Sequence, residues 1–250
     1  MVRRWAINTA VFVLFVAAWD IAVRLSDVQG VVVPRPGEVL KSIIDGLVTR
    51  GIYWDHIWVT IIETLAGFAI GAAIGLALGV LVGEVAFLRQ TLYPYIIAFQ
   101  TIPKVAVAPL FVIWFGFGLA SKVAIAATIS FFPIVVNVIS GLDSADHNKI
   151  EMLKVFGASK WQQFWLAKAP SALPFLFAGL DIAIVLSIIG AIVAEFVGAQ
   201  RGIGYLIMQY NFNLNTAGIF ALLVVLSLIG VVLHFLVVAV QRRIIFWQRS

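Results

Sequence analysis

Six long apolar stretches alternate with shorter polar segments along the chain. A helix needs roughly 20 apolar residues to cross the hydrocarbon core of a bilayer, and each stretch is close to that length. The pattern therefore predicts an all-α integral membrane protein, in which residues 1–250 form one domain with six transmembrane helices. The expected spans cover residues 6–23, 58–83, 92–117, 123–142, 172–194 and 217–240.

The first stretch resembles a secretory signal in one respect, because Arg3 and Arg4 precede it. It lacks a small-x-small cleavage site, however, and five further apolar stretches follow it. We therefore expect it to be retained as a membrane helix. Between the first two stretches, the apolar positions of residues 36–47 recur on one helical face and predict a short helix at the membrane interface.

The segment 143–170 is too polar to cross the membrane, and its punctuation predicts two short helices joined by a sharp bend. Asp146 can cap the first helix, and Gly157 stands where a helix end favours a left-handed residue. Ser159 begins a capping-box pattern for the second helix, which we expect to end at Pro170. Two uses fit this element: packing at the membrane interface, or docking of a cytoplasmic partner.

Five glycines in the second apolar stretch are spaced by four residues. Residues four apart lie on one face of a helix, and glycine there lets a neighbouring backbone approach closely. This stripe predicts tight helix packing, and a sliding or gating surface is the alternative. It consists of Gly67, Gly71, Gly75, Gly79 and Gly83.

Prolines punctuate the third and fourth apolar stretches. Each proline removes a backbone hydrogen bond, and a broken helix at membrane depth persists only where protein or a water-filled cavity satisfies the freed groups. These two stretches are therefore expected to line a pathway. The prolines are Pro94, Pro103, Pro109 and Pro133.

Charged side chains also occur inside the apolar stretches, where they are costly and commonly functional. Lys104, Asp181 and Glu195 each fit two uses, contact with a solute path or a structural pairing. Glu63, near one end of its stretch, is expected at the membrane interface. The candidate pathway or gate residues are Pro103, Lys104, Pro109, Trp114, Phe131, Asn137, Asp181 and Glu195.

The composition agrees with a membrane protein, since 62% of the residues are hydrophobic, 12% are charged and the mean hydropathy is +1.06. The net charge of +5 comes without a run of basic residues or a basic face, which argues against nucleic acid as a partner. With the N-terminus inside the cell, ten Lys and Arg residues fall on the cytoplasmic side and six on the other. Because basic residues favour cytoplasmic loops, both termini are expected in the cytoplasm.

The sequence lacks the residue patterns of an enzyme. It contains no cysteine, its three histidines are far apart, and no phosphate-binding Gly-x-x-x-x-Gly-Lys-Ser/Thr pattern occurs. We therefore expect no catalytic residue, metal or bound cofactor in this chain.

Two groups of residues resemble the permease subunits of ATP-binding-cassette importers. The run Glu151-Met-Leu-Lys-Val-Phe-Gly157, followed by Pro170 and Leu173-Pro174, is similar to their cytoplasmic signature of Glu-Ala-Ala, Gly and Leu-Pro. A second, ordered set of motifs resembles the branch that handles nitrate, sulfonates, taurine and related solutes. It comprises Ile102-Pro103-Lys104, Ala108-Pro109-Leu110, residues 113–118, Ser121-Lys122, Phe132-Pro133, Ala194-Glu195 and Gly202-Ile203-Gly204-Tyr205.

The resemblance implies the type I importer fold and a location in the bacterial inner membrane. It also implies a second permease subunit, expected to be identical, two ATPase subunits that hold ATP and Mg²⁺, a periplasmic or lipid-anchored solute-binding protein, and membrane lipid. The chain would form the path for a small anionic or organic solute such as nitrate, a sulfonate or taurine. An ATP-independent secondary transporter or channel is the alternative.

The same resemblance assigns the segment 143–170 to coupling with the ATPase, because a stiff bend with a small tip can enter a groove on a partner. Met152 and Leu153 replace the two small alanines of the signature, and Ala167 replaces a branched aliphatic residue. Asp181 stands where relatives carry a basic residue. The candidate coupling residues are Glu151, Phe156, Gly157, Ala158, Ser159 and Lys160.

Overall fold

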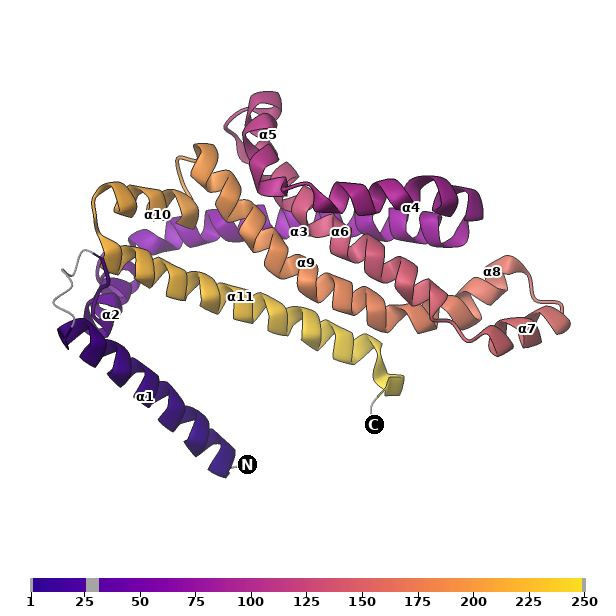
Figure 1. Ribbon diagram of the computed structural model, residues 1–250, viewed down its shortest axis with the longest axis horizontal. Helices are drawn as coiled ribbons and strands as arrows, with labels where there is room; N and C mark the ends of the chain where they lie inside the picture. Colours follow the sequence, from indigo (N-terminus) through magenta and orange to yellow (C-terminus); the bar gives the residue numbers. More distant parts are fainter. Residues whose placement is uncertain (1, 26–31, 249–250) are drawn as a thin grey trace.

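A computed structural model of the chain describes residues 2–25 and 32–248, and in these residues the backbone forms helices and turns without a strand. The molecule is elongated (Figure 1). The long helices are α1 (Val2–Leu25), α3 (Ile52–Glu84), α4 (Ala86–Thr101), α6 (Leu119–Asp143), α9 (Ala169–Gly198) and α11 (Thr216–Ile244). The shorter elements are α2 (Pro36–Ile44), η1 (Asp45–Thr49), η2 (Lys104–Val107), α5 (Ala108–Phe115), α7 (His147–Val155), α8 (Lys160–Gln163), η3 (Phe164–Lys168), α10 (Ile203–Phe212) and η4 (Phe246–Gln248).

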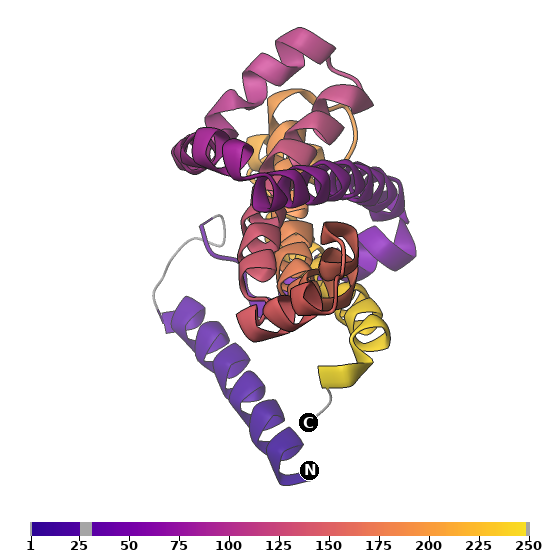
Figure 2. The same ribbon diagram turned by 90° about the vertical axis from the view of Figure 1, so that its right-hand side faces the viewer.

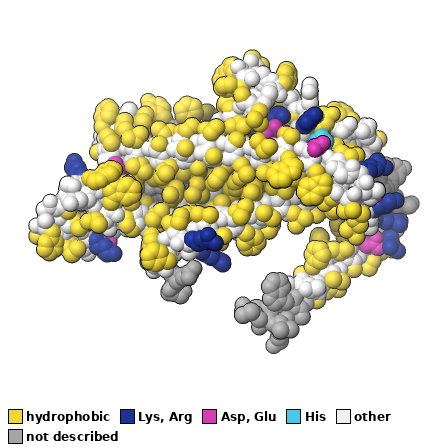
Figure 3. All heavy atoms as spheres, turned by 180° about the vertical axis from the view of Figure 1, so that it is seen from behind, with side chains coloured by type: hydrophobic (Ala, Val, Ile, Leu, Met, Phe, Trp, Pro, Cys, Tyr) yellow, Lys and Arg dark blue, Asp and Glu magenta, His cyan; other side chains and the backbone are white. Residues whose placement is uncertain are grey.

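The described helices confirm the expected all-α membrane protein. Five are long and apolar enough to cross a membrane, and a sixth apolar unit is made by α4 together with Lys104–Phe115, which are bent by 85° relative to each other. Hydrophobic side chains cover most of the face seen in Figure 3, which agrees with contact to lipid. The five helices are Ile7–Leu25 within α1, Ile52–Glu84, Leu119–Asp143, the continuous run Lys160–Gly198, and Thr216–Ile244.

The third apolar stretch is divided at one of its prolines. The chain is extended at Ile102, and the 3₁₀ turn η2 then leads into α5. Pro103 precedes this turn, where its missing amide hydrogen costs no helical hydrogen bond. Because α4 and α6 continue through Pro94 and Pro133, the break lies at Pro103.

Helix α6 packs against α3 along the five-glycine stripe. A Cβ atom added at Gly75 would lie 2.8 Å from the backbone oxygen of Phe131, and one at Gly79 would lie 2.8 Å from Cβ of Val138. These positions therefore leave no room for a side chain. The facing positions on α6 also advance by four residues, which shows that the two helices run parallel in register, and they are Ala126, Ser130, Ile134, Val138 and Leu142.

Helix α9 packs on α6 with equally close approach, but it runs antiparallel. A Cβ atom added at Gly190 would lie 2.7 Å from Cα of Ala126, and one added at Gly141 would lie 2.9 Å from Cα of Ala172. Helix α6 is thus enclosed by α3 and α9, and 61% of its most apolar window is buried, more than in any other described span. Figure 2 shows these helices grouped at the centre, with α1 diverging from them.

The polar ends of the core helices carry two compact elements. The elbow, which we define as α7 and α8 with the turn between them, lies at one end of the long axis, and α10 lies near the other (Figure 1). Helix α6 leads into the elbow and the run from α8 to α9 leads out of it, whereas α10 connects α9 to α11. Both elements are therefore attached directly to the core.

The close approach of α3 and α6 makes a testable prediction. Replacing Gly75 by Leu should lower the stability of the folded chain by about 1–3 kcal/mol or more, because overpacking forces the two backbones apart. The measurement is the midpoint of thermal unfolding in detergent. The matched control is Ala73→Leu, since Ala73 lies on the exposed face of the same helix; an equal loss in both variants would contradict the packing role of the stripe.

Candidate functional site

The elbow is fixed by local hydrogen bonds at both of its helix starts. The side chain of Asp146 accepts a hydrogen bond from Asn148 N at 2.9 Å and caps α7. Ser159 forms the expected capping box with Gln162, since Ser159 N donates to Gln162 Oε1 at 2.8 Å and Gln162 N donates to Ser159 Oγ at 3.3 Å. Each short helix thereby begins with a backbone amide bound to a nearby side chain of the same element.

The turn between the two helices depends on glycine. Gly157 has a φ of +79°, in the left-handed region that other residues rarely adopt, and Ala158 N closes the helix end by donating to Leu153 O at 2.9 Å. Next to this turn, Val155 and Phe156 are 85% and 80% exposed. The tip of the elbow therefore presents large apolar side chains beside a glycine that has open space around it.

The second elbow helix does not end at Pro170 as expected. The chain continues from α8 through the π-helical segment η3 into α9, and Pro170 lies in the first turn of α9. Ala169 N donates to Phe164 O, five residues back, and this wider turn carries the helix up to the proline. The elbow is consequently joined to the membrane helix α9 by unbroken helical backbone.

The candidate pathway residues fall on different sets of elements. Lys104, next to the break, donates from Nζ to Gln100 O at 3.1 Å, and its Nζ lies 4.7 Å from the ring centroid of Phe132. In α9, the Asp181 carboxylate lies 2.5 Å from Nδ1 of His234 in α11. In α6, Asn137 donates to the backbone oxygen of Pro133 at 2.8 Å. Trp114 is exposed in α5, whereas Phe131 is partly buried beside α4.

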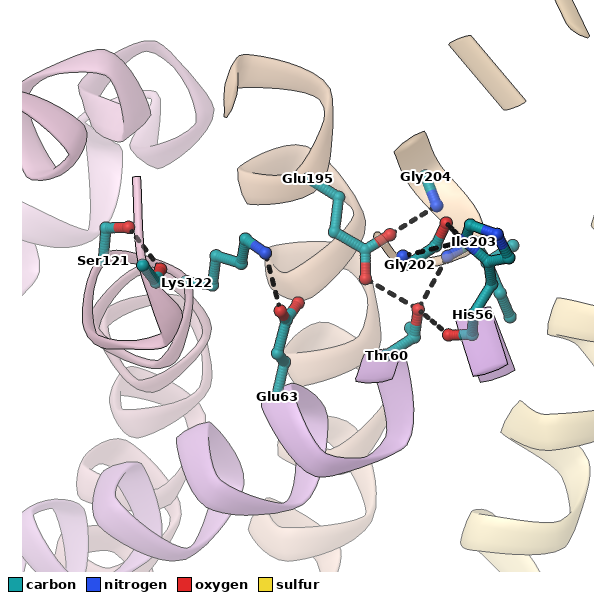
Figure 4. A network of polar contacts seen from close by, with 10 residues as sticks. His56, Thr60, Glu63, Ser121, Lys122, Glu195, Gly202, Ile203 and Gly204 are labelled. Atoms are coloured by element: carbon teal, nitrogen blue, oxygen red, sulfur yellow. Dashed lines mark hydrogen bonds and ion pairs between the residues drawn. The ribbon is translucent and has the colours of Figure 1, made fainter. Parts of the chain in front are cut away.

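Glu195 lies in a buried polar cluster near the end of the molecule where α10 lies (Figure 4). It accepts a hydrogen bond from Thr60 Oγ1 at 2.6 Å and another, short one from Gly204 N. Thr60 Oγ1 in turn accepts from Ile203 N at 2.8 Å. Side chains of α3 and α9 thereby satisfy amides at the start of α10, which a helix cannot satisfy by itself.

A third amide of the same segment is bound by α3. Gly202 N donates to His56 Nδ1 at 3.1 Å, so three successive amides are held by three side chains. Gly202 has a φ of +114°, and a Cβ atom there would collide with the carboxylate of Glu195. Glycine is therefore required for α10 to begin this close to the buried carboxylate.

The cluster also contains an ion pair that sequence reasoning misplaced. Lys122 Nζ lies 2.9 Å from Glu63 Oε1, and both side chains are at most 9% exposed. Glu63 is thus inside the core instead of at the interface, and Lys122 belongs to α6 instead of an external loop. The reason is the packing of α3 against α6, which brings the two charges together and excludes solvent.

A signal for this cluster was present in the sequence. Thr60, Glu63, Thr64 and Gly67 follow one another at helical spacing on the face that carries the glycine stripe. Polar residues that extend a packing face are buried together with it. Their partners on α6 and α9 could not be named, because nothing local links them to α3.

The buried ion pair makes a second prediction. Lys122→Met should destabilise the chain by about 3–5 kcal/mol, because it leaves the Glu63 carboxylate buried without its cation. The double variant Lys122→Met/Glu63→Leu should recover most of this loss, since an apolar pair of similar volume replaces both charges. Thermal unfolding in detergent measures both effects, and a double variant less stable than the single one would contradict this account.

Comparison with known proteins places the chain in a family. Residues 71–246 match the family described as "Binding-protein-dependent transport system inner membrane component". The chain is 40% identical to the riboflavin transport system permease protein RibX of Chloroflexus aurantiacus, covering 95% of this chain and 88% of that protein. It is 34% identical to the formylaminopyrimidine transport permease protein ThiX of Halalkalibacterium halodurans, with 97% and 96% covered.

More distant relatives and a solved structure agree with this assignment. The taurine transport system permease protein TauC of Escherichia coli is 25% identical over 98% of this chain and 91% of its own length. A structure of the MetNI methionine ABC transporter in an inward-facing conformation matches with a TM-score of 0.63 and 25% identity, covering 81% of this chain and 96% of that one. The chain therefore belongs to the binding-protein-dependent transport system inner membrane components, as a multi-pass permease subunit of an ATP-binding-cassette importer whose ATP is hydrolysed by a separate subunit.

Proposed function

We propose that two identical copies of this chain enclose the path of a small heterocyclic solute, and that the elbow couples this path to the ATPase. ATPase and solute-binding partners and a dimeric arrangement follow from the type I importer fold. The proposal adds the identity of the copies, the orientation, the coupling residues and the solute class. The observation that carries it is the exposed, capped elbow attached to α6 and α9, the two most tightly packed helices.

The elbow has the properties that a coupling contact requires. Its two helices are capped, which stabilises the backbone of the elbow against local unfolding when a partner binds at its tip. Phe156, which is 80% exposed, provides an apolar anchor of the kind that dominates protein interfaces. The proposed contact with the ATPase consists of Glu151, Phe156, Gly157, Ala158, Ser159 and Lys160.

The elbow end is assigned to the cytoplasm, where ATP is available. Ten basic residues lie on this side of the proposed topology and six on the other. Lys122, one of the six, is buried in an ion pair and does not count as a loop charge, which strengthens the bias. Both termini are then cytoplasmic.

The broken helix α4–α5 is proposed to line the path. Helix α4 buries none of its residues within this chain, and irregular backbone at membrane depth needs protein or a water-filled cavity beside it. Pro103, Lys104, Pro109 and Trp114 belong to this unit. From α6, Phe131 packs against the same cluster as Tyr93 and Ile96 of α4.

The three remaining candidates have partners that support a structural part in this chain. Asp181 contacts His234, Glu195 binds Thr60 and the Gly204 amide at the start of α10, and Asn137 binds the backbone oxygen of Pro133. Each polar group is engaged between or within helices of the same chain. We therefore assign Asp181 and Glu195 to pairing between helices and Asn137 to a contact within α6, instead of solute contact.

The proposed solute is a small nitrogen heterocycle of the vitamin-precursor type instead of a sulfonate. The relatives named for riboflavin and formylaminopyrimidine are 40% and 34% identical to this chain, whereas those named for sulfonates and taurine are 25–31% identical. The charge of α4–α5 points the same way. Its two cations, Arg89 and Lys104, are engaged with Asp143 and with the Gln100 backbone oxygen.

Transport by vesicles that contain the assembled complex tests this function. With the ATPase and the solute-binding protein present, riboflavin or formylaminopyrimidine should accumulate only when ATP is supplied, and taurine should not. The control omits the binding protein. Uptake driven by an ion gradient without ATPase would favour a secondary transporter, and uptake of taurine alone would overturn the solute class.

The coupling role predicts a specific loss in a Gly157→Val variant. Valine cannot adopt the left-handed backbone and adds bulk at the tip, so solute-stimulated ATP hydrolysis should fall to the basal rate while membrane insertion stays normal. Gly37→Val is the matched control, because this glycine also has open space but does not have a positive φ. Stimulation that survives in the Gly157 variant would remove the elbow from the coupling contact.

A further inference from the structure

Two ion pairs connect the ends of the elbow to a single hinge in the chain. Arg89 Nη1 and Nη2 donate to the two carboxylate oxygens of Asp143, each at 2.6 Å. Lys168 Nζ donates to both carboxylate oxygens of Glu84, each at 2.9 Å. We call these four residues the ionic bracket.

The bracket has a regular placement in the sequence. Asp143 is the last residue of α6, just before the elbow, and Lys168 ends η3, just after it. Glu84 is the last residue of α3, and Arg89 lies in the first turns of α4. Only Val85, with extended backbone, separates α3 from α4. The Asp143–Arg89 pair therefore links the residue before the elbow to α4, and the Lys168–Glu84 pair links the residue after the elbow to α3.

Helix α4 makes few other contacts that would hold it to the core. It buries none of its residues, and its Tyr93 and Ile96 pack against a cluster formed by Val82, Val135 and Ile139. The Arg89–Asp143 pair adds a contact of defined direction, because a guanidinium and a carboxylate joined by two parallel hydrogen bonds have one preferred geometry. The pair therefore fixes how the start of α4 lies relative to the end of α6.

The exposure of the bracket shows that stability is not its main contribution. The side chains of Arg89 and Asp143 are each 42% exposed, and those of Lys168 and Glu84 are 27% and 29% exposed. Ion pairs with this access to solvent contribute little to folding. They do, however, fix the relative orientation of the elements that carry them.

We propose that the ionic bracket makes the elbow and the α3–α4 hinge move as one body, so that displacement of the elbow repositions the broken helix α4–α5. Glu84, Arg89, Asp143 and Lys168 are positioning residues in this scheme, and none of them contacts the solute or the ATPase. The inference rests on the proposed coupling role of the elbow. It adds how movement at the elbow reaches the helix proposed to line the path.

Charge reversal and charge exchange test the bracket in the assembled complex. Arg89→Glu should lower solute-stimulated ATP hydrolysis by at least about fivefold, the lower range for coupling between two sites, with basal hydrolysis and thermal stability unchanged. The exchanged variant Arg89→Asp/Asp143→Arg should restore most of the stimulation. Arg24→Glu is the control, because it breaks an ion pair within α1 that joins no two elements. Failure of the exchange to restore stimulation overturns the proposal.

A chemical cross-link gives an independent test, and the absence of cysteine from the chain makes it direct. The pair Glu84→Cys/Lys168→Cys, joined by a short bis-maleimide before assembly with the ATPase, should keep solute-stimulated hydrolysis, whereas the unlinked pair should lose it. Stimulation abolished by the link would show that the bracket must open. If the Gly157→Val variant keeps solute-stimulated ATP hydrolysis, the proposed coupling role of the elbow is wrong. If that variant loses the stimulation but the charge exchange or the cross-link fails as described, only the proposal for the bracket is wrong.

Discussion

The close approach of α3 and α6 is the contact on which the rest of the structure depends. Lipid is as apolar as leucine, so helices in a membrane gain little from hydrophobic burial and associate through dispersion contacts and hydrogen bonds. Five glycines at four-residue spacing let the backbone of α3 touch α6 over its length, and the glycines of α9 repeat this from the other side. The result is a three-helix core with α6 at its centre.

This packing decides which polar groups are buried. At the α10 end, the face that carries the glycine stripe continues with Thr60 and Glu63, so the same contact that excludes lipid also encloses these side chains. A buried charge is tolerated when it has a partner of opposite sign, and Lys122 is that partner for Glu63. Beside this pair, Thr60 and Glu195 bind amides at the start of α10. The cluster thus fastens α10 to the core helices.

The same core helices carry the elbow at their other end. Because α6 enters the elbow and the continuous helix from α8 to α9 leaves it, the elbow is anchored in the most tightly packed part of the molecule. The bent unit α4–α5 is different, since it buries little surface against its own chain. A rigid core beside a loosely held, broken helix is an arrangement in which force on one element can move the other.

Much of this could be predicted from the sequence, because the responsible forces act locally. The length of an apolar stretch specifies a membrane helix, since lipid leaves the backbone no other hydrogen-bond partner. The caps at Asp146 and Ser159 and the turn at Gly157 are also local, because they involve residues within five positions of one another. Other expectations failed where packing intervened. Glu63 was assigned to the interface and Pro170 to a helix end, yet burial against α6 and a π-helical turn changed both.

The sequence alone therefore determined the long apolar helices, the capped turn of the elbow and the resemblance to the family. Only the tertiary structure decided the pairing of Glu63 with Lys122, of Arg89 with Asp143 and of Thr60 with the Ile203 amide at the start of α10. These contacts join helices whose residues are up to 143 positions apart, and their geometry depends on how the helices cross. No local pattern contains that information, because a side chain's partner is set by which backbone lies opposite it.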